Sequence, residues 1–334
     1  MINNYTFPLI DKDEPICQRA KLDTGTFCNY ECSFCYYIDR LHEKTDLDVV
    51  KQRVDYIYEC GIREVDLSGG ESSVRTDWFE LLDYCKSKEM SVSTVTNGYK
   101  FADHDFMKKS KEHGLQEILF SVHGPNNDIH DLVVGRKGAF KRIIKAIENA
   151  HDLGILVRIN YVVNQHSYSL TDEFVCMVDQ VKPYELNFLT LNFFGSANEY
   201  LPYKLSTTHI KHCIDIVDVP IINVRYVPYC YMEGYEKYVC NTFQHIYDRY
   251  DWNMAVYDQR IDPEVYKKDP LDALYKQAQE DRKRMYYKPE QCKGCKHLLI
   301  CDGLENVVHD DVMPTEGPVV KEINHYRKEY YAKV

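Results

Sequence analysis

Three cysteines near the beginning of the chain stand close enough together to bind one metal centre. They lie in the segment Cys28-Asn-Tyr-Glu-Cys32-Ser-Phe-Cys35, with three residues between the first two and two between the last two. Three thiolates on one short loop can hold three irons of a cubane iron–sulfur cluster and leave the fourth iron open to a small molecule. Zinc is the alternative, but structural zinc is usually held by two paired groups of ligands. The spacing therefore favours an iron–sulfur cluster with one open iron.

A second group of cysteines lies near the end of the chain. Its members, separated by two and five residues, are Cys292, Cys295 and Cys301. Such a site needs a fourth ligand, and Cys230 is favoured because it directly follows a predicted strand. Cys240 is the alternative, either as a ligand or as a free thiol, and His297 could replace one thiolate. The group therefore predicts an iron–sulfur cluster or a zinc site.

The composition limits where this chemistry takes place. The chain has 334 residues and 13 cysteines, an odd number, and its first residues lack the positive segment and apolar core of a secretory signal. No apolar run is long enough to cross a membrane. We therefore expect a cytoplasmic protein whose reduced cysteines bind metal instead of forming disulfides. The isolated cysteines are expected to be small buried residues, and they are Cys17, Cys60, Cys85, Cys176 and Cys213.

The charge of the chain excludes one class of partner. The net charge is −11, and the Lys and Arg residues are scattered along the sequence. A broad field of this sign repels a phosphate backbone, so extended binding of nucleic acid is not expected.

Strand-like and helix-like segments alternate from about residue 16 to about residue 195. The expected strands are Cys17–Asp23, Glu64–Ser68, Ser91–Thr96, Glu117–His123, Leu156–Val163 and Glu185–Asn192. Between them, apolar residues recur at helical spacing, as in Thr45–Glu59, where Thr45 is the expected cap, and in Gly138–His151. Six β-then-α units in a row predict a parallel α/β sheet, either an incomplete barrel or a doubly wound sheet.

In both architectures the chemistry gathers at the carboxyl ends of the strands. Polar and glycine-rich segments occur at these places: the cysteine loop follows the first strand, Gly69-Gly70-Glu71 the second, Asn97-Gly98 the third and His123-Gly124 the fourth. These segments are therefore expected on one rim of the sheet.

The pattern changes after about residue 200. A helix over Ser206–Val217 and one more strand over Ile221–Val227 are followed by an irregular segment rich in tyrosine and cysteine. No Gly/Ser-rich linker separates this segment from the rest, so we expect it to pack directly against the sheet. The predicted organisation is an N-terminal extension (1–15), a partial barrel (16–225) and a small C-terminal iron–sulfur subdomain (226–334).

The cysteine loop and the rim motifs resemble the radical S-adenosylmethionine (radical SAM) superfamily. The resemblance implies a partial (β/α)6 TIM-like barrel, a 4Fe–4S cluster on Cys28, Cys32 and Cys35, and S-adenosylmethionine bound to the open iron. It further implies that reductive cleavage of this cofactor yields a 5′-deoxyadenosyl radical, which abstracts hydrogen from a C–H bond.

The same resemblance assigns cofactor contacts along the rim. Phe34 matches the aromatic residue beside the adenine. Gly69, Gly70 and Glu71 match the motif that binds the cofactor's ammonium group, with Ser72 in place of the usual proline. The remaining matching positions, at the third to fifth strands, are Asn97, Ser121, Arg158 and Asn160. Without the resemblance, Ser121 would be a small barrel residue and Arg158 a surface charge.

The second cysteine group resembles the auxiliary-cluster motif of SPASM and Twitch proteins. A further cysteine of that motif is replaced here by Glu305. The resemblance therefore implies one auxiliary 4Fe–4S cluster, held by Cys292, Cys295, Cys301 and Cys230, instead of two.

The expected activity is that of a radical SAM oxidoreductase, isomerase or epimerase. Only 27 residues precede Cys28, too few for the peptide-recognition domain of many peptide maturases. This favours oxidation or epimerisation of a small polar metabolite such as a sugar, an aminocyclitol or a nucleotide-like compound. The alternatives are a maturase acting on a delivered peptide and a non-catalytic iron–sulfur or zinc protein. Cys240 and His123 are the candidate catalytic residues, and a flavodoxin or ferredoxin is the expected electron donor.

Overall fold

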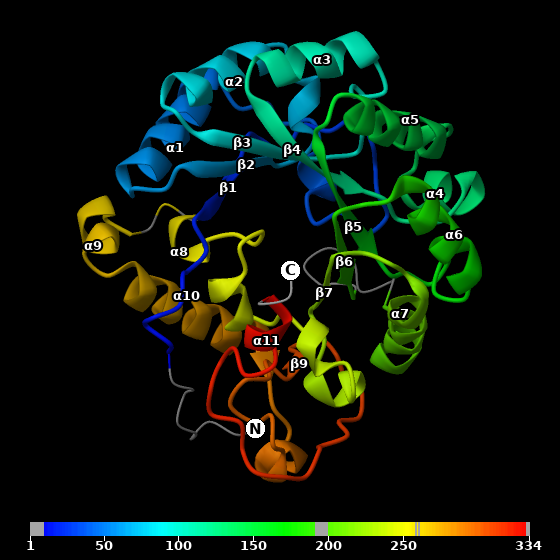
Figure 1. Cartoon of the computed structure of the whole chain (residues 1–334), viewed down its shortest axis with the longest axis vertical. Coiled ribbons are helices and arrows are strands. Elements are labelled where there is room, and N and C mark those ends of the chain that lie inside the picture. Colours follow the sequence, from blue (N-terminus) through cyan, green and yellow to red (C-terminus); the bar gives the residue numbers. More distant parts are fainter. Residues whose placement is uncertain (1–9, 191–199, 258, 260, 332–334) are drawn as a thin grey trace.

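The computed structural model describes residues 10–190, 200–257, 259 and 261–331. Its centre is a sheet of seven parallel strands whose order follows the chain (Figure 1). The strands are β1 (Arg19–Asp23), β2 (Glu64–Ser68), β3 (Ser91–Thr96), β4 (Leu115–Ser121), β5 (Leu156–Val162), β6 (Glu185–Leu189) and β7 (Ile221–Arg225). Sequential order confirms the partial barrel and excludes the doubly wound sheet, in which the order reverses at a switch point.

Helices follow the strands and cover the outer face of the curled sheet (Figure 1). They are α1 (Leu47–Glu59), α2 (Trp78–Ser87), α3 (His104–Glu112), α4 (Asn127–Val133), α5 (Ala139–Asp152), α6 (Thr171–Val181) and α7 (Tyr203–Ile216). The predicted cap of α1 is wrong, because Asp46 is the N-cap residue. Thr45 instead packs against Gly25, where an added Cβ atom would lie 2.8 Å from the Thr45 hydroxyl oxygen.

Beyond the six predicted β-then-α units, the further strand predicted over Ile221–Val227 is present as β7, which ends at Arg225. β7 pairs in parallel with β6, from Glu185 opposite Ile221 to Leu189 opposite Arg225. The last two residues of the predicted sixth strand, Leu191 and Asn192, lie outside the described residues.

The strands alternate in polarity along their length. Ala20, Leu22, Val65 and Leu67 belong to the apolar core beneath the helices. Most residues at the intervening positions, which face the inside of the curl, are polar or charged, namely Arg19, Lys21, Glu64, Asp66, Glu117, Arg158, Asn160, Glu185, Asn187, Asn223 and Arg225. Apolar residues at such positions that line the cavity are Val95, Leu119, Val162 and Leu189. Because side chains alternate between the two faces of a strand, the helices cover an apolar face and the interior of the barrel is left mostly polar.

A segment without strand structure closes the gap between β7 and β1. On one side, the backbone N–H of Cys240 donates to Val224 O in β7 at 2.9 Å. On the other side, the N–H of Asn253 donates to Arg19 O in β1 at 2.6 Å, and the N–H of Cys17 donates to Ile246 O at 2.7 Å. Residues 239–254 therefore stand where an eighth strand would complete the barrel.

The rest of the chain forms a cysteine-rich region beside this closing segment, yellow to red in Figure 1. Its elements are α8 (Met254–Tyr257), α9 (Pro263–Lys268), α10 (Pro270–Met285), β8 (Tyr286–Tyr287), β9 (Leu304–Glu305) and α11 (Lys328–Tyr331). β8 and β9 pair antiparallel, and Arg282 of α10 donates to the backbone oxygens of Leu299 and Cys301.

Four of the five isolated cysteines are buried, as predicted, but Cys176 is exposed on α6. Its helix buries Phe174, Val175 and Met177 instead. No helix in the described part of the chain is long and apolar enough to span a membrane.

Candidate functional site

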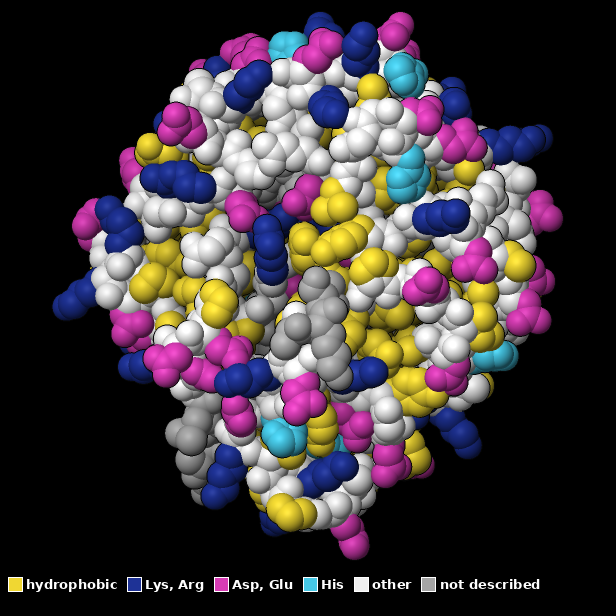
Figure 2. Space-filling view, in the orientation of Figure 1, with side chains coloured by type: hydrophobic (Ala, Val, Ile, Leu, Met, Phe, Trp, Pro, Cys, Tyr) yellow, Lys and Arg dark blue, Asp and Glu magenta, His cyan; other side chains and the backbone are white. Residues whose placement is uncertain are grey.

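A cavity of about 690 Å³ opens at the carboxyl ends of the strands. This volume is that of a small-molecule or cofactor site. On the face shown in Figure 2, hydrophobic side chains gather around the centre of the molecule, with charged side chains between them. The predicted residues that line the cavity are Cys28, Cys32, Phe34, Cys35, Gly69, Gly70, Glu71, Asn97, Ser121, His123, Arg158, Asn160 and Cys240. The fold therefore brings together residues from the first strand to the closing segment.

Backbone N–H groups of the cysteine loop bond to its sulfur atoms. The N–H of Tyr30 donates to Cys28 Sγ at 3.5 Å, and the N–H of Tyr37 donates to Cys35 Sγ at 3.4 Å. Such bonds stabilise thiolate ligands. Burial, with the nearby charge of Glu71, raises the pKa of Cys28 to about 12. Three close thiols with raised pKa values fit a cation that stabilises their thiolates, as the irons of a 4Fe–4S cluster do.

The glycines of Gly69-Gly70-Glu71 allow this segment to pack against the base of the cysteine loop. An added Cβ atom would lie 2.1 Å from Gly25 O at Gly69 and 2.2 Å from Phe27 O at Gly70. The N–H of Glu71 donates to Phe27 O at 2.8 Å. The two glycines therefore fix the carboxylate beside the cysteines.

The Glu71 carboxylate is buried and fits a cationic ligand. It accepts hydrogen bonds from Thr96 Oγ1 at 2.7 Å, from the N–H of Asn97 at 2.6 Å and from Ser73. Burial raises the pKa of Glu71 although these bonds lower it. No Lys, Arg or His of the described chain forms an ion pair with it, so an ammonium group would supply the missing counter-charge.

The third to fifth strands contribute polar side chains and one imidazole. Ser121 and Asn160 are paired across β4 and β5 and both line the cavity. His123 accepts the N–H of Val162 at Nδ1 and packs edge-on to Phe34, with ring centroids 4.8 Å apart. Burial, helped by His130, lowers the pKa of His123 to about 3, so His123 is a neutral imidazole at neutral pH.

Arg158 lies inside the barrel among carboxylates. Its nitrogens are 3.4 Å from Asp66, 3.5 Å from Glu117 and 3.7 Å from Glu185. The side chain is fully buried, so it is not a surface charge. Its contact with a cofactor carboxylate stays a prediction, while its ion pairs in the structure are with the protein.

The second cysteine group converges on a small separate cavity. Cys230, Cys292, Cys295 and Cys301 all line it, together with His297. The N–H of Gly303 donates to Cys301 Sγ at 3.3 Å. The Nε2 atom of His297 is already bonded to the Tyr326 hydroxyl at 2.7 Å. Four thiols at one place fit a second cluster, and we propose Cys230 as its fourth ligand.

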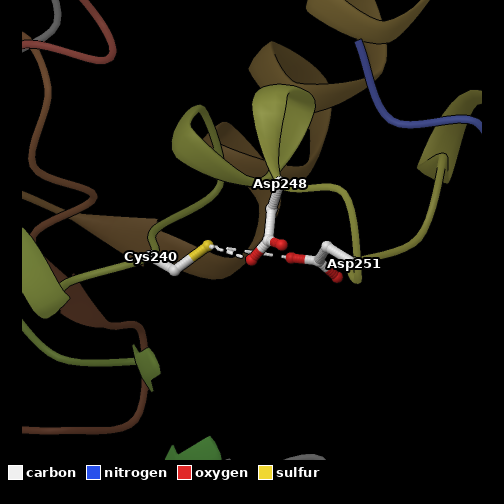
Figure 3. Close-up of side chains that lie close together, drawn as sticks. All are labelled: Cys240, Asp248 and Asp251. Carbon is white, nitrogen blue, oxygen red and sulfur yellow. Dashed lines mark hydrogen bonds between the residues drawn. The ribbon is translucent and has the colours of Figure 1, made fainter. Parts of the chain in front are cut away.

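Cys240 lies in the large cavity instead, beside two carboxylates. Its Sγ is 3.6 Å from Asp248 Oδ2 and 3.8 Å from Asp251 Oδ2, and the three side chains point toward one another (Figure 3). Arg225 bonds to both carboxylates and approaches the same sulfur to 3.7 Å. Burial, with the two carboxylates, raises the pKa of Cys240, and Arg225 opposes this shift. Cys240 is therefore held as a neutral thiol.

Sequence reasoning missed the neighbours of Cys240. Asn241 is 3 % exposed and lines the cavity, and both polar atoms of its side chain lack a hydrogen-bond partner in the described structure. His245, with an unpartnered Nε2, also lines it. These residues belong to the irregular closing segment, which has no periodicity to predict its position. The sequence feature that could have indicated a polar interior is the alternation of polar and apolar residues along the strands.

Comparison with known proteins finds one family model and several curated relatives. Residues 22–166 match the family model described as the Radical SAM superfamily. Mycofactocin maturase MftC of Mycolicibacterium smegmatis is 28% identical over 168 residues, covering 49% of this chain and 42% of that protein. The probable GTP 3′,8-cyclase of Saccharolobus solfataricus is 30% identical over 202 residues, covering 58% and 61%. The chain thus spans about half the length of the curated relatives it matches.

Solved structures share the fold. Streptococcus suis SuiB bound to precursor peptide SuiA has a TM-score of 0.58 at 15% identity, covering 86% of this chain and 72% of SuiB. The protein anSMEcpe with bound AdoMet and Cp18Cys peptide has a TM-score of 0.58 at 16% identity, covering 94% and 95%. The cofactors are those of the family, a 4Fe–4S cluster and S-adenosylmethionine, with thiols for an auxiliary cluster in the SPASM/Twitch-like C-terminal region. Residues 22–166 therefore match the radical SAM superfamily, and the partial barrel and the cysteine loop agree with that match.

Proposed function

We propose that this chain is a radical SAM enzyme that activates a C–H bond of a peptide. The observation that carries the proposal is Asn241, whose unpartnered amide lines the same cavity as the cysteine loop. A buried side-chain amide offers two donors and one acceptor oxygen, which match the C=O and N–H of a peptide unit. Leaving such groups unpaired is costly, so a ligand that bonds to them gains affinity.

The comparisons support a peptide as well. SuiB and anSMEcpe share the fold and were each solved with a peptide bound. The sequence alone favoured a small polar metabolite, and the probable GTP 3′,8-cyclase is a relative consistent with that alternative. Because the unpartnered amide of Asn241 can pair with a peptide unit, a peptide is the substrate we favour.

The side chains that line the cavity have separate roles in this proposal. When bound, the cluster and S-adenosylmethionine supply a radical that takes a hydrogen atom from carbon. Glu71 holds a cationic group beside the cysteine loop, and Phe34 with His123 forms the neighbouring wall. Ser121 and Asn160 offer hydrogen bonds to sugar hydroxyls or to substrate. The expected electron donor is a low-potential flavodoxin or ferredoxin.

Mass spectrometry tests this proposal. The chain is co-produced, under anaerobic conditions, with each short peptide encoded next to its gene. We expect one peptide to change in mass or in configuration, and the Cys32→Ala variant to leave it unchanged. If every peptide stays unmodified while a nucleotide or sugar is converted, the peptide proposal is wrong.

A further inference from the structure

Two sulfur-bearing segments stand on different sides of the barrel. The cysteine loop bonds to the chain beyond β4, since the N–H of Ser33 donates to Val133 O at 2.9 Å. Cys240 is instead tied to β7. Because the strand order is sequential, β4 is the middle strand of the curl and faces the gap between β7 and β1. A substrate in the cavity therefore has the cysteine loop on one side and Cys240 on the other.

We propose that Cys240 donates a hydrogen atom to the substrate radical, so that the enzyme inverts the configuration at an α-carbon of its peptide. This inference rests on the proposed function and specifies its reaction. An S–H bond and the α-C–H bond of a peptide are similar in strength, so a thiol that faces an α-carbon radical can transfer its hydrogen atom. Reduction of the resulting thiyl radical then drives the transfer forward. Return of hydrogen from the face opposite to its removal inverts the carbon.

The surroundings of Cys240 keep it in the form this step requires. A thiolate has no hydrogen atom to give, and its charge would be repelled by Asp248 and Asp251. With carboxylate oxygens at 3.6 and 3.8 Å, the sulfur is placed to donate its proton in a hydrogen bond. The sulfur also accepts a hydrogen bond from Arg225 Nη1 at 3.7 Å, as Cys28, Cys35 and Cys301 accept backbone N–H groups, and its contacts with two carboxylates set Cys240 apart from them.

The same cluster could be taken for a metal site, since its three ligand atoms lie within 4.8 Å of one another. Arg225 argues against this. Its guanidinium bonds to both carboxylates and lies 3.7 Å from the sulfur, and Arg327 is 3.8 Å from Asp248. These cations already balance the acidic pair, so a metal ion would have to displace Arg225.

Asn241 explains how a peptide α-carbon reaches the thiol. It is the next residue after Cys240, and its free amide lines the cavity. A peptide unit bonded to this amide would lie in the same cavity as the Cys240 sulfur, and its α-carbon carries a hydrogen that can be abstracted.

The step balances in atoms and electrons. The substrate C–H bond breaks when its hydrogen atom is abstracted. The Cys240 S–H bond then breaks homolytically as a new C–H bond forms, which leaves a thiyl radical. One electron from the low-potential protein donor and one proton from water restore the thiol. Because the S–H exchanges with solvent, the returned hydrogen comes from water.

The test compares the reconstituted parent chain with Cys240→Ser and Cys240→Ala in D₂O, using the peptides encoded next to the gene. Cys213→Ser is the matched control, because Cys213 is equally buried but lies on α7 outside the cavity. The parent and the control should give a D-residue with one deuterium at its α-carbon. The Cys240 variants should still form 5′-deoxyadenosine that carries a peptide hydrogen, while the D-residue falls to background, and their iron content should equal that of the parent.

Several outcomes would overturn the inference. One is a Cys240 variant that still forms the deuterated D-residue at the parental level. Another is loss of one cluster's iron in both variants, which would make Cys240 a ligand. A parent that removes hydrogens from a peptide without taking up deuterium would retain the proposed function but exclude inversion. A parent that modifies no peptide would contradict the proposed function itself.

Discussion

The sulfur of Cys240 lies 3.6 Å from a carboxylate oxygen of Asp248. Burial by itself raises the pKa of Asp248, but the guanidinium groups of Arg225 and Arg327 lower it below its ordinary value. The carboxylate is therefore ionised and accepts a hydrogen bond from the thiol, which keeps its proton. This relationship separates Cys240 from the cysteines proposed to hold clusters.

Cys230→Ser should remove the auxiliary cluster, whereas Cys240→Ser should not. Only Cys230 shares a cavity with Cys292, Cys295 and Cys301. Iron and sulfide analysis of anaerobically reconstituted protein should show the loss of one cluster's content for Cys230→Ser and the parental content for Cys240→Ser. The reverse result would make Cys240 the fourth ligand, and zinc in place of this iron would contradict the auxiliary cluster.

Arg158→Met should destabilise the protein. Removal of this guanidinium leaves Asp66 and Glu185 without their ion-pair partner inside the barrel, while Glu117 keeps Arg19 at 2.8 Å. The expected cost is about 3–5 kcal/mol in the free energy of unfolding. Chemical denaturation measures the change, and Arg63→Met, at an exposed position, is the control. An unchanged stability together with weaker binding of S-adenosylmethionine would instead support Arg158 as a direct cofactor contact.

Asn241→Ala should weaken peptide binding. Loss of hydrogen bonds that leaves substrate groups unpaired costs about 1–3 kcal/mol, which corresponds to a KM higher by roughly 5- to 150-fold. Steady-state kinetics on the modified peptide would show this rise with a smaller change in kcat. Asn127→Ala, at an exposed residue of α4, should keep the parental KM. Equal KM values for the two variants would count against a role of Asn241 in binding.

Acid should destabilise the fold because the imidazoles of His123 and His130 are buried in the neutral form. Burial lowers the pKa of His130 to about 4, against 6.5 for an unperturbed histidine, although Asp131 opposes the shift. Between these values the unfolded chain binds a proton that the folded chain does not, so stability falls as the pH drops from 6.5 toward 4. His130 accounts for roughly 3 kcal/mol of this loss.

Unfolding measured across this pH range checks the prediction. His130→Asn keeps an acceptor for the N–H of His123, which His130 Nδ1 now accepts at 3.1 Å, and removes the titration. The free energy of unfolding of His130→Asn should fall less than that of the parent as the pH drops from 6.5 toward 4. His42→Asn, at an exposed residue, should show the same pH dependence as the parent. Identical pH profiles for His130→Asn and the parent would refute this explanation.

The strands and the rim of the site were predictable because their signals are local. β2 and β3 begin and end at the predicted residues, since runs of β-forming residues are bounded there by turn signals. The rim followed from the rule that parallel strands present their carboxyl ends on one edge.

The closing segment was not predictable because its position depends on contacts distant in sequence. The backbone N–H of Asn253 donates to Arg19 O, and Asp251 forms an ion pair with Arg225. No periodic pattern in the sequence predicts either contact. The thiol of Cys240 was therefore known as a candidate from its residue type, but its acidic neighbours emerged only from the fold.

Formation of 5′-deoxyadenosine tests the central claim most directly. The chain is reconstituted with iron and sulfide, reduced with dithionite and supplied with S-adenosylmethionine, with and without the candidate peptides. We predict that 5′-deoxyadenosine accumulates in the parent chain and is lost in Cys32→Ala, while Cys176→Ser, at an exposed cysteine, keeps the parental amount. A fully reconstituted and reduced parent chain that never forms 5′-deoxyadenosine, even with every candidate peptide present, would contradict it.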